Sequence, residues 1–95
     1  MDEAIAVDNL RQVKTILDEY RINYWLDIGT LLGAVRDGKI ISWDHDIDLG
    51  TWCEQVSDIV SACRELRNQE FEIRLSRNYV NIEKEGCPIN VLYIA

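Results

Sequence analysis

The 95 residues have a mass of 11.0 kDa, which predicts one small domain, residues 1–95, and excludes a two-domain architecture. Hydrophobic residues make up 47% and charged residues 28%, as in ordinary globular proteins, which excludes disorder and collagen-like order. The net charge of −7 leaves no general basic surface, so long DNA or RNA is not an expected partner. An anionic nucleotide would instead need a divalent metal to bridge its phosphates to carboxylates.

The cysteines and the N-terminus indicate a reducing compartment. Cys53, Cys63 and Cys87 are odd in number and form no C-x-x-C pair, so neither a disulfide framework nor a zinc site is expected. The N-terminus is acidic, and no run approaches the roughly 18 apolar residues of a membrane span. We therefore expect reduced thiols with core roles, no signal peptide, no membrane span and a cytoplasmic location.

Hydrophobic periodicity predicts the elements in the first two thirds of the chain. Apolar residues recur every three or four positions over residues 4–20 and again over 52–66, which predicts two long amphipathic helices. Residues 24–28 predict a buried strand, and 30–36 a short helix with Thr30 as its N-cap. Polar and apolar residues alternate over 46–49, which predicts a second strand closed by Gly50.

Three short strands complete the chain, over residues 71–75, 79–83 and 88–94, with a turn at Glu85-Gly86 between the last two. The order of elements predicts an α+β fold. It consists of a mixed β-sheet of about five short strands, two long amphipathic helices and one short helix, with helices against one face.

The turn after the first strand has the features of a phosphate site. Gly29 lets the backbone approach a ligand closely, and a helix that begins at Thr30 offers free N–H groups to a phosphate. A strand, glycine, threonine and helix in this order is also typical of any β-to-α turn, so the pattern alone does not decide for function.

Asp46 and Asp48 form the second part of the candidate site. Residues i and i+2 of a strand point to one face about 6.5 to 7 Å apart, so two carboxylates can converge on Mg²⁺ or Mn²⁺. Ile47 and Leu49 would then face the core. The alternative is a pair of solvated acids on an edge strand, but with Asp44 three carboxylates crowd five positions, which favours a bound cation.

Together these parts resemble the nucleotidyltransferase fold shared with DNA polymerase beta. The string GTLLGAVR over 29–36, Ile40-Ile41, and WDHDID over 43–48 is similar to the hallmark of the LicD family, which includes phosphocholine and fukutin-related ribitol-phosphate transferases. The resemblance implies metal-dependent transfer of a nucleotidyl or alcohol-phosphate group, such as phosphocholine, from a nucleotide-activated donor, a CDP-alcohol or NTP, to an acceptor hydroxyl on a glycan.

The resemblance also implies residue roles. Asp46 and Asp48 match the family's catalytic metal-binding pair, and Gly29 and Thr30 match its phosphate-contacting turn. Arg36 matches a basic position that holds a donor phosphate. His45 stands where the family usually has another Asp; we interpret it as a hydrogen-bonding neighbour rather than a general base.

A third carboxylate, expected on a later strand, is replaced by Asn90. An amide can ligate a metal through oxygen but cannot take a proton at neutral pH. Three explanations stay open: reduced or lost catalysis, a substitute acid such as Glu83 or Glu85, or an engineered Asp-to-Asn change.

The segments by which family members bind the acceptor are expected to be missing, so a homo-oligomer or a partner subunit is one way to complete the site. Trp52, Tyr79, Tyr93 and Ile94 are candidates for such a surface, although core packing is the favoured interpretation. Three functions remain: the transferase, a catalytically impaired nucleotide-binding or regulatory module, and a small domain that nucleotidylates a protein partner.

Overall fold

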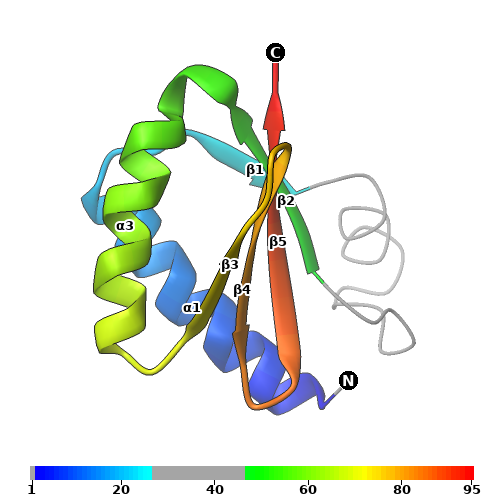
Figure 1. Cartoon of the computed structure of the whole chain (residues 1–95). Helices are drawn as coiled ribbons and strands as arrows, with labels where there is room; N and C mark the ends of the chain where they lie inside the picture. The colour runs from blue at the N-terminus through cyan, green and yellow to red at the C-terminus, as the bar shows by residue number, and fades with distance from the viewer. Residues whose placement is uncertain (1, 27–46) are drawn as a thin grey trace.

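The computed structural model describes residues 2–26 and 47–95 (Figure 1). Within these ranges the elements follow in the order α1 (Glu3–Glu19), β1 (Tyr24–Leu26), β2 (Ile47–Trp52), a 3-10 helix η1 (Cys53–Gln55), α3 (Val56–Asn68), β3 (Glu72–Leu75), β4 (Tyr79–Lys84) and β5 (Cys87–Ile94). The α+β class predicted from the sequence is therefore confirmed. The short helix predicted over 30–36 lies outside the described residues.

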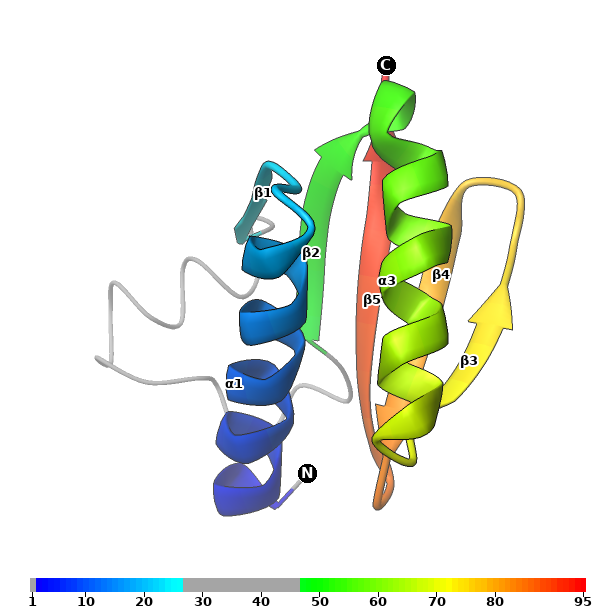
Figure 2. The ribbon, with the colours of Figure 1, turned by 90° about the vertical axis from the view of Figure 1, so that its left-hand side faces the viewer.

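The five strands form one mixed sheet in the order β1-β2-β5-β4-β3. β2 and β5 are parallel, and the other three neighbouring pairs are antiparallel. Helices α1 and α3 lie side by side against one face of this sheet (Figures 1 and 2). We call the opposite face the far face, and none of the described helices lies on it.

The core fills the space between the helices and the sheet. Every second residue of the central strands points to the helices and is buried, and each helix contributes an apolar stripe at three- and four-residue spacing. Burying one such aliphatic side chain stabilises the fold by about 1.5 to 3 kcal/mol. Side chains that are fully shielded from solvent include Leu17, Ile47, Leu49, Ile59, Leu66, Ile82 and Ile89.

Both long helices end without glycine. Arg21 and Glu70 adopt left-handed conformations, with φ of 56° and 72°, and the N–H of the next residue donates back to the last turn of the helix. That next residue is Ile22 or Phe71, and each is buried in the core. Among the described residues, no helix is long and apolar enough to cross a membrane.

The junction between β2 and α3 differs from the prediction. The predicted strand end at Gly50 is wrong, because β2 continues through Gly50 to Trp52. A Cβ atom at Gly50 would lie 2.4 Å from Nε1 of Trp25, so glycine makes room there for an indole rather than for a turn. The predicted helix start at Trp52 is also wrong, since η1 intervenes and α3 begins at Val56.

Core roles are confirmed for two of the three cysteines. Cys63 and Cys87 are buried, whereas Cys53 is exposed. The favoured core interpretation is wrong for three apolar residues at the ends of strands. The exposed fraction is 44% for Trp52, 41% for Tyr79 and 41% for Ile94.

Candidate functional site

A row of polar residues crosses the far face. Asp48 on β2 pairs with Asn90 on β5, Asn90 pairs with Asn81 on β4, and Asn81 pairs with Arg74 on β3. Strand alternation places them together because their chain neighbours, such as Ile47, point to the helices and are buried. We call Asp48, Asn90, Asn81 and Arg74 the polar row.

Hydrogen bonds along the polar row fix the orientation of its amides. Nδ2 of Asn81 donates to Oδ1 of Asn90 over 2.9 Å, and Nδ2 of Asn90 donates to Oδ1 of Asp48 over 3.3 Å. Asn90 therefore presents its N–H group, not its carbonyl oxygen, to the Asp48 carboxylate. In this arrangement Asn90 is a hydrogen-bond donor to Asp48, and its oxygen is directed toward β4.

The structure thus brings together two of the residues that the sequence singled out, Asp48 and Asn90, although 42 positions separate them. The others lie outside the described residues: Gly29, Thr30, Arg36, Asp46 and the neighbouring His45.

The polar row also contains two residues that the sequence analysis did not assign to the site, Asn81 and Arg74. Strand alternation puts Tyr79, Asn81 and Glu83 on one face, but the sequence does not give the strand order that would place this face relative to Asp48. It is the far face, since Asn81 and Glu83 line one hollow with Asn90.

Two joined hollows lie on the far face. The smaller, of about 190 Å³, is lined by Asp48, Tyr79, Asn90 and Leu92. The larger, of about 370 Å³, is lined by Arg74, Ser76, Tyr79, Asn81, Glu83, Pro88 and Asn90. Tyr79 and Asn90 line both, so the two hollows adjoin, and Asp48 lines the smaller one.

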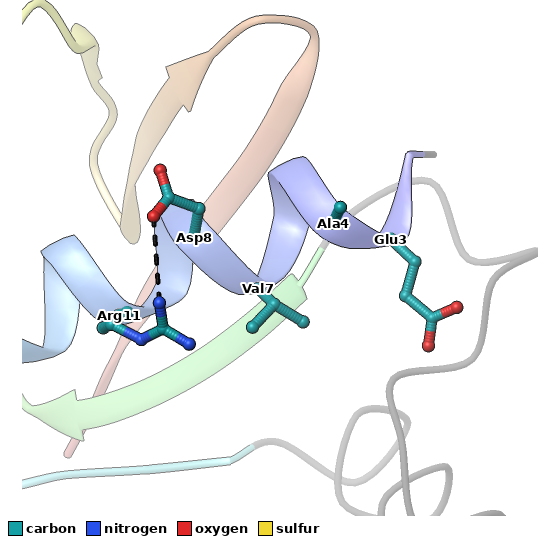
Figure 3. A pocket seen from close by; sticks show the side chains of 5 residues that line it. All are labelled: Glu3, Ala4, Val7, Asp8 and Arg11. Atoms are coloured by element: carbon teal, nitrogen blue, oxygen red, sulfur yellow. Dashed lines mark ion pairs between the residues drawn. The ribbon is translucent and has the colours of Figure 1, made fainter.

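A more voluminous hollow, of about 690 Å³, runs along the outer side of α1 (Figure 3). Its polar groups include an exposed ion pair between Arg11 and Asp8 with 4.0 Å between nitrogen and oxygen. Such a solvated pair one helical turn apart contributes little energy. Because α1 packs on the face opposite to Asp48, this hollow is separate from the candidate site.

The donor chemistry at Asp48 suits a hard cation. Mg²⁺ is typically held by one or two carboxylates together with water and substrate phosphates. Among residues 2–26 and 47–95, no group of three or more His, Cys, Asp or Glu side chains could hold a metal ion by itself. Within these ranges the far-face row contributes one carboxylate, that of Asp48, to such a site.

The buried thiols are unsuited to nucleophilic catalysis. Burial raises the pKa of Cys63 to about 11, so this thiol stays protonated at neutral pH. Cys87, the first residue of β5, is buried, and its Sγ lies 3.8 Å from the backbone oxygen of Asp2 at the start of α1. Among the described residues, those that line the hollow beside Asp48 carry oxygen and nitrogen groups and no thiol.

Comparison with known proteins relates this geometry to a family. Residues 21–88 match the family described as LicD/FKTN/FKRP, nucleotidyltransferase domain. The chain is 43% identical over 63 residues to the ribitol 5-phosphate transferase FKRP of Mus musculus and of Homo sapiens, which covers 66% of this chain and 12% of those proteins. It is 36% identical over 47 residues to the lipopolysaccharide cholinephosphotransferase LicD of Haemophilus influenzae, covering 50% of this chain and 18% of that protein.

Solved structures agree on the fold. A solution structure of the antibiotic-resistance factor ANT(2'')-Ia matches 96% of this chain and 48% of its own, with a TM-score of 0.75 and 17% identity. A crystal structure of ANT(2")-Ia in complex with adenylyl-2"-tobramycin matches 90% of this chain and 49% of its own, with a TM-score of 0.65 and 18% identity. The chain thus spans less than half of these proteins and a smaller part of the curated relatives.

Proposed function

Because the chain belongs to the LicD/FKTN/FKRP family of nucleotidyltransferase domains, we propose that it transfers an alcohol-phosphate group from a CDP-alcohol to a hydroxyl acceptor. The observation that carries the proposal is the far-face position of Asp48. Its half-buried carboxylate lies in a hollow and accepts a hydrogen bond from Asn90, the residue that the resemblance implies stands in place of a third carboxylate. Family relatives that transfer ribitol 5-phosphate and choline phosphate support this reaction class.

The proposed reaction forms and breaks one bond each at phosphorus. The acceptor oxygen bonds to the phosphorus that carries the alcohol, the bond from this phosphorus to the bridging oxygen breaks, and CMP leaves with that oxygen. The proton of the acceptor hydroxyl passes to water or to a carboxylate, because the amide of Asn90 cannot accept it at neutral pH.

Each candidate site residue has a defined task in this proposal. Asp46 and Asp48 would hold Mg²⁺ or Mn²⁺, which when bound neutralises charge on the phosphates. Gly29 and Thr30 would contact the donor phosphates through backbone N–H groups, and Arg36 would pair with their charge. Asn90 holds the Asp48 carboxylate in place through the 3.3 Å hydrogen bond.

Isothermal titration tests this assignment. CDP-choline, CTP and ATP are titrated into the chain with and without Mg²⁺, and then into Asp46→Ala and Asp48→Ala. We expect binding that requires Mg²⁺ and that both substitutions abolish, with circular dichroism showing that the variants stay folded. The matched control is Asp58→Ala, since Asp58 is an exposed acid on α3 and its removal changes the net charge equally. If the parent binds no nucleotide with Mg²⁺, or both site variants bind as well as the parent, the proposal fails.

A second function is favoured by one specific observation, the amide of Asn90. A nucleotide-binding or regulatory module that has lost turnover would keep the metal-dependent binding above and yield no product. Asn90→Asp would restore a group able to accept a proton opposite Asp48. Product formed by this variant but not by the parent, with donor binding equal in both, would favour the module over the enzyme.

A further inference from the structure

The groove on the far face extends away from Asp48 and has a chemistry of its own. Its larger part is formed by β3, β4 and β5, and we call the surface lined by Arg74, Ser76, Tyr79, Asn81, Glu83, Pro88 and Asn90 the β3–β5 groove. From Asp48 to Arg74 the polar row crosses three strand spacings, a span of about 14 Å between Cα atoms. This length exceeds a single sugar ring.

The groove offers both hydrogen-bond donors and acceptors. Oδ1 of Asn81 makes no hydrogen bond within the described part of the chain, and the exposed guanidinium of Arg74 is in no ion pair there. Glu83 adds a carboxylate that only accepts. A ligand that both donates and accepts through closely spaced groups, as a row of hydroxyls does, is complementary to this lining.

The charge of the β3–β5 groove argues against a polyanionic ligand. Its one basic and one acidic side chain, Arg74 and Glu83, cancel each other in a chain whose net charge is −7. Phosphate groups are typically bound by clustered cations or helix N-termini, which this lining lacks. Tyr79, with 41% of its surface exposed, supplies an aromatic face with a polar tip, which suits an amphipathic ring.

The groove also lies on one defined side of Asp48. β1, after which Gly29 and Thr30 follow in the sequence, borders β2 on one edge, while β5, β4 and β3 extend from the other. A ligand held on β3–β5 would therefore reach Asp48 from the β5 side of β2.

We infer that the β3–β5 groove is the acceptor subsite and binds an uncharged, polyhydroxylated, sugar-like acceptor whose reacting hydroxyl is directed toward Asp48. Arg74, Tyr79, Asn81 and Glu83 determine its specificity. This inference rests on the proposed function for the reaction, but the binding of a sugar to the groove is testable without it.

The test is a titration of the isotope-labelled chain with methyl glycosides of galactose, N-acetylglucosamine and glucose, followed by amide nuclear magnetic resonance. For at least one glycoside we expect saturable shifts of the backbone amides of Tyr79, Asn81 and Asn90 and of the side-chain amides of the two asparagines. Arg74→Ala and Tyr79→Ala should weaken that binding by about tenfold. Their matched controls are Arg77→Ala in the β3–β4 turn and Tyr20→Ala after α1, both exposed and outside the groove; these should bind as the parent does.

The outcomes separate the inference from the proposed function. Arg74→Ala and Tyr79→Ala should retain Mg²⁺-dependent nucleotide binding, because neither residue holds the donor. If nucleotides bind but no glycoside shifts the groove, or if inorganic phosphate shifts it in place of the glycosides, the inference is overturned and the proposed function stands. If glycosides bind to a chain that binds no nucleotide, the sugar-binding groove is supported and the proposed transfer reaction is contradicted.

Discussion

At the scale of single residues, the direction of one amide decides what Asp48 faces. Because Asn81 donates to Oδ1 of Asn90, the N–H group of Asn90 is directed to Asp48. Asn81→Asp replaces that donor with a group that only accepts. Asn90 should then turn its N–H toward residue 81 and its carbonyl oxygen toward Asp48. We expect the affinity for Mg²⁺, titrated without nucleotide, to rise by about tenfold, since two oxygens then face one cation.

Charge alone would also attract Mg²⁺, so Asn78→Asp is the control. Asn78 lies in the exposed β3–β4 turn and its substitution adds the same charge without a bond to Asn90. Equal gains in Mg²⁺ affinity for the two variants would show that the orientation of Asn90 is irrelevant. Without metal, Asn81→Asp should lower the free energy of unfolding by about 1 kcal/mol more than the control, because the oxygens of Asn90 and Asp48 then repel each other.

At the scale of elements, the close approach of β1 to β2 depends on Gly50. The absence of a side chain at Gly50 leaves room for the Trp25 indole. This indole also contacts the ring of Trp52, with 4.9 Å between the ring centroids. Gly50→Ala should lower the free energy of unfolding by about 1 to 3 kcal/mol through overpacking. In a Trp25→Ala background the same change should cost less than about 0.5 kcal/mol. Urea unfolding followed by circular dichroism measures the cycle, and additive costs would contradict the proposed contact.

The sequence predicted those features that depend on local patterns. Helical spacing and strand alternation, such as the burial of Ile47 and Leu49 around Asp48, identified the element types and the side of the sheet that faces the core. The turn at Glu85-Gly86 was also predicted, and both residues have the positive φ of a two-residue hairpin.

Features that depend on distant partners could not be predicted in this way. Gly50 was interpreted as a strand end because its reason for being glycine is the indole of Trp25, 25 positions earlier in the chain and on another strand. The role of Asn81 required the strand order, since only the pairing of β4 with β5 places it beside Asn90. The sequence therefore predicted the face on which Asp48 lies but not the hydrogen bonds that Asn81 and Asn90 make beside it.

At the scale of the whole molecule, one buried amide joins the two ends of the chain. Asn9 on α1 is 1% exposed, and its Nδ2 donates to the backbone oxygens of Lys84 over 2.8 Å and of Cys87 over 3.2 Å. These two residues flank the β4–β5 turn, 75 or more positions away. These two hydrogen bonds tie the N-terminal helix to the hairpin that carries Asn81 and Asn90.

Asn9→Ala should lower the free energy of unfolding by about 2 to 4 kcal/mol, because two buried carbonyl oxygens lose their donor.

Asn9→Asp should lower the free energy of unfolding further at neutral pH, since a carboxylate then faces those oxygens. Burial raises the pKa of such an acid in the folded state, so the extra cost should fall as the pH drops toward about 4, where the neutral acid donates one hydrogen bond. Urea unfolding of both variants across this range measures the difference, with the exposed Asn68→Asp as the control. If Ala and Asp cost the same at every pH, the side chain of Asn9 only fills space, and its hydrogen bonds to Lys84 and Cys87 do not contribute to stability.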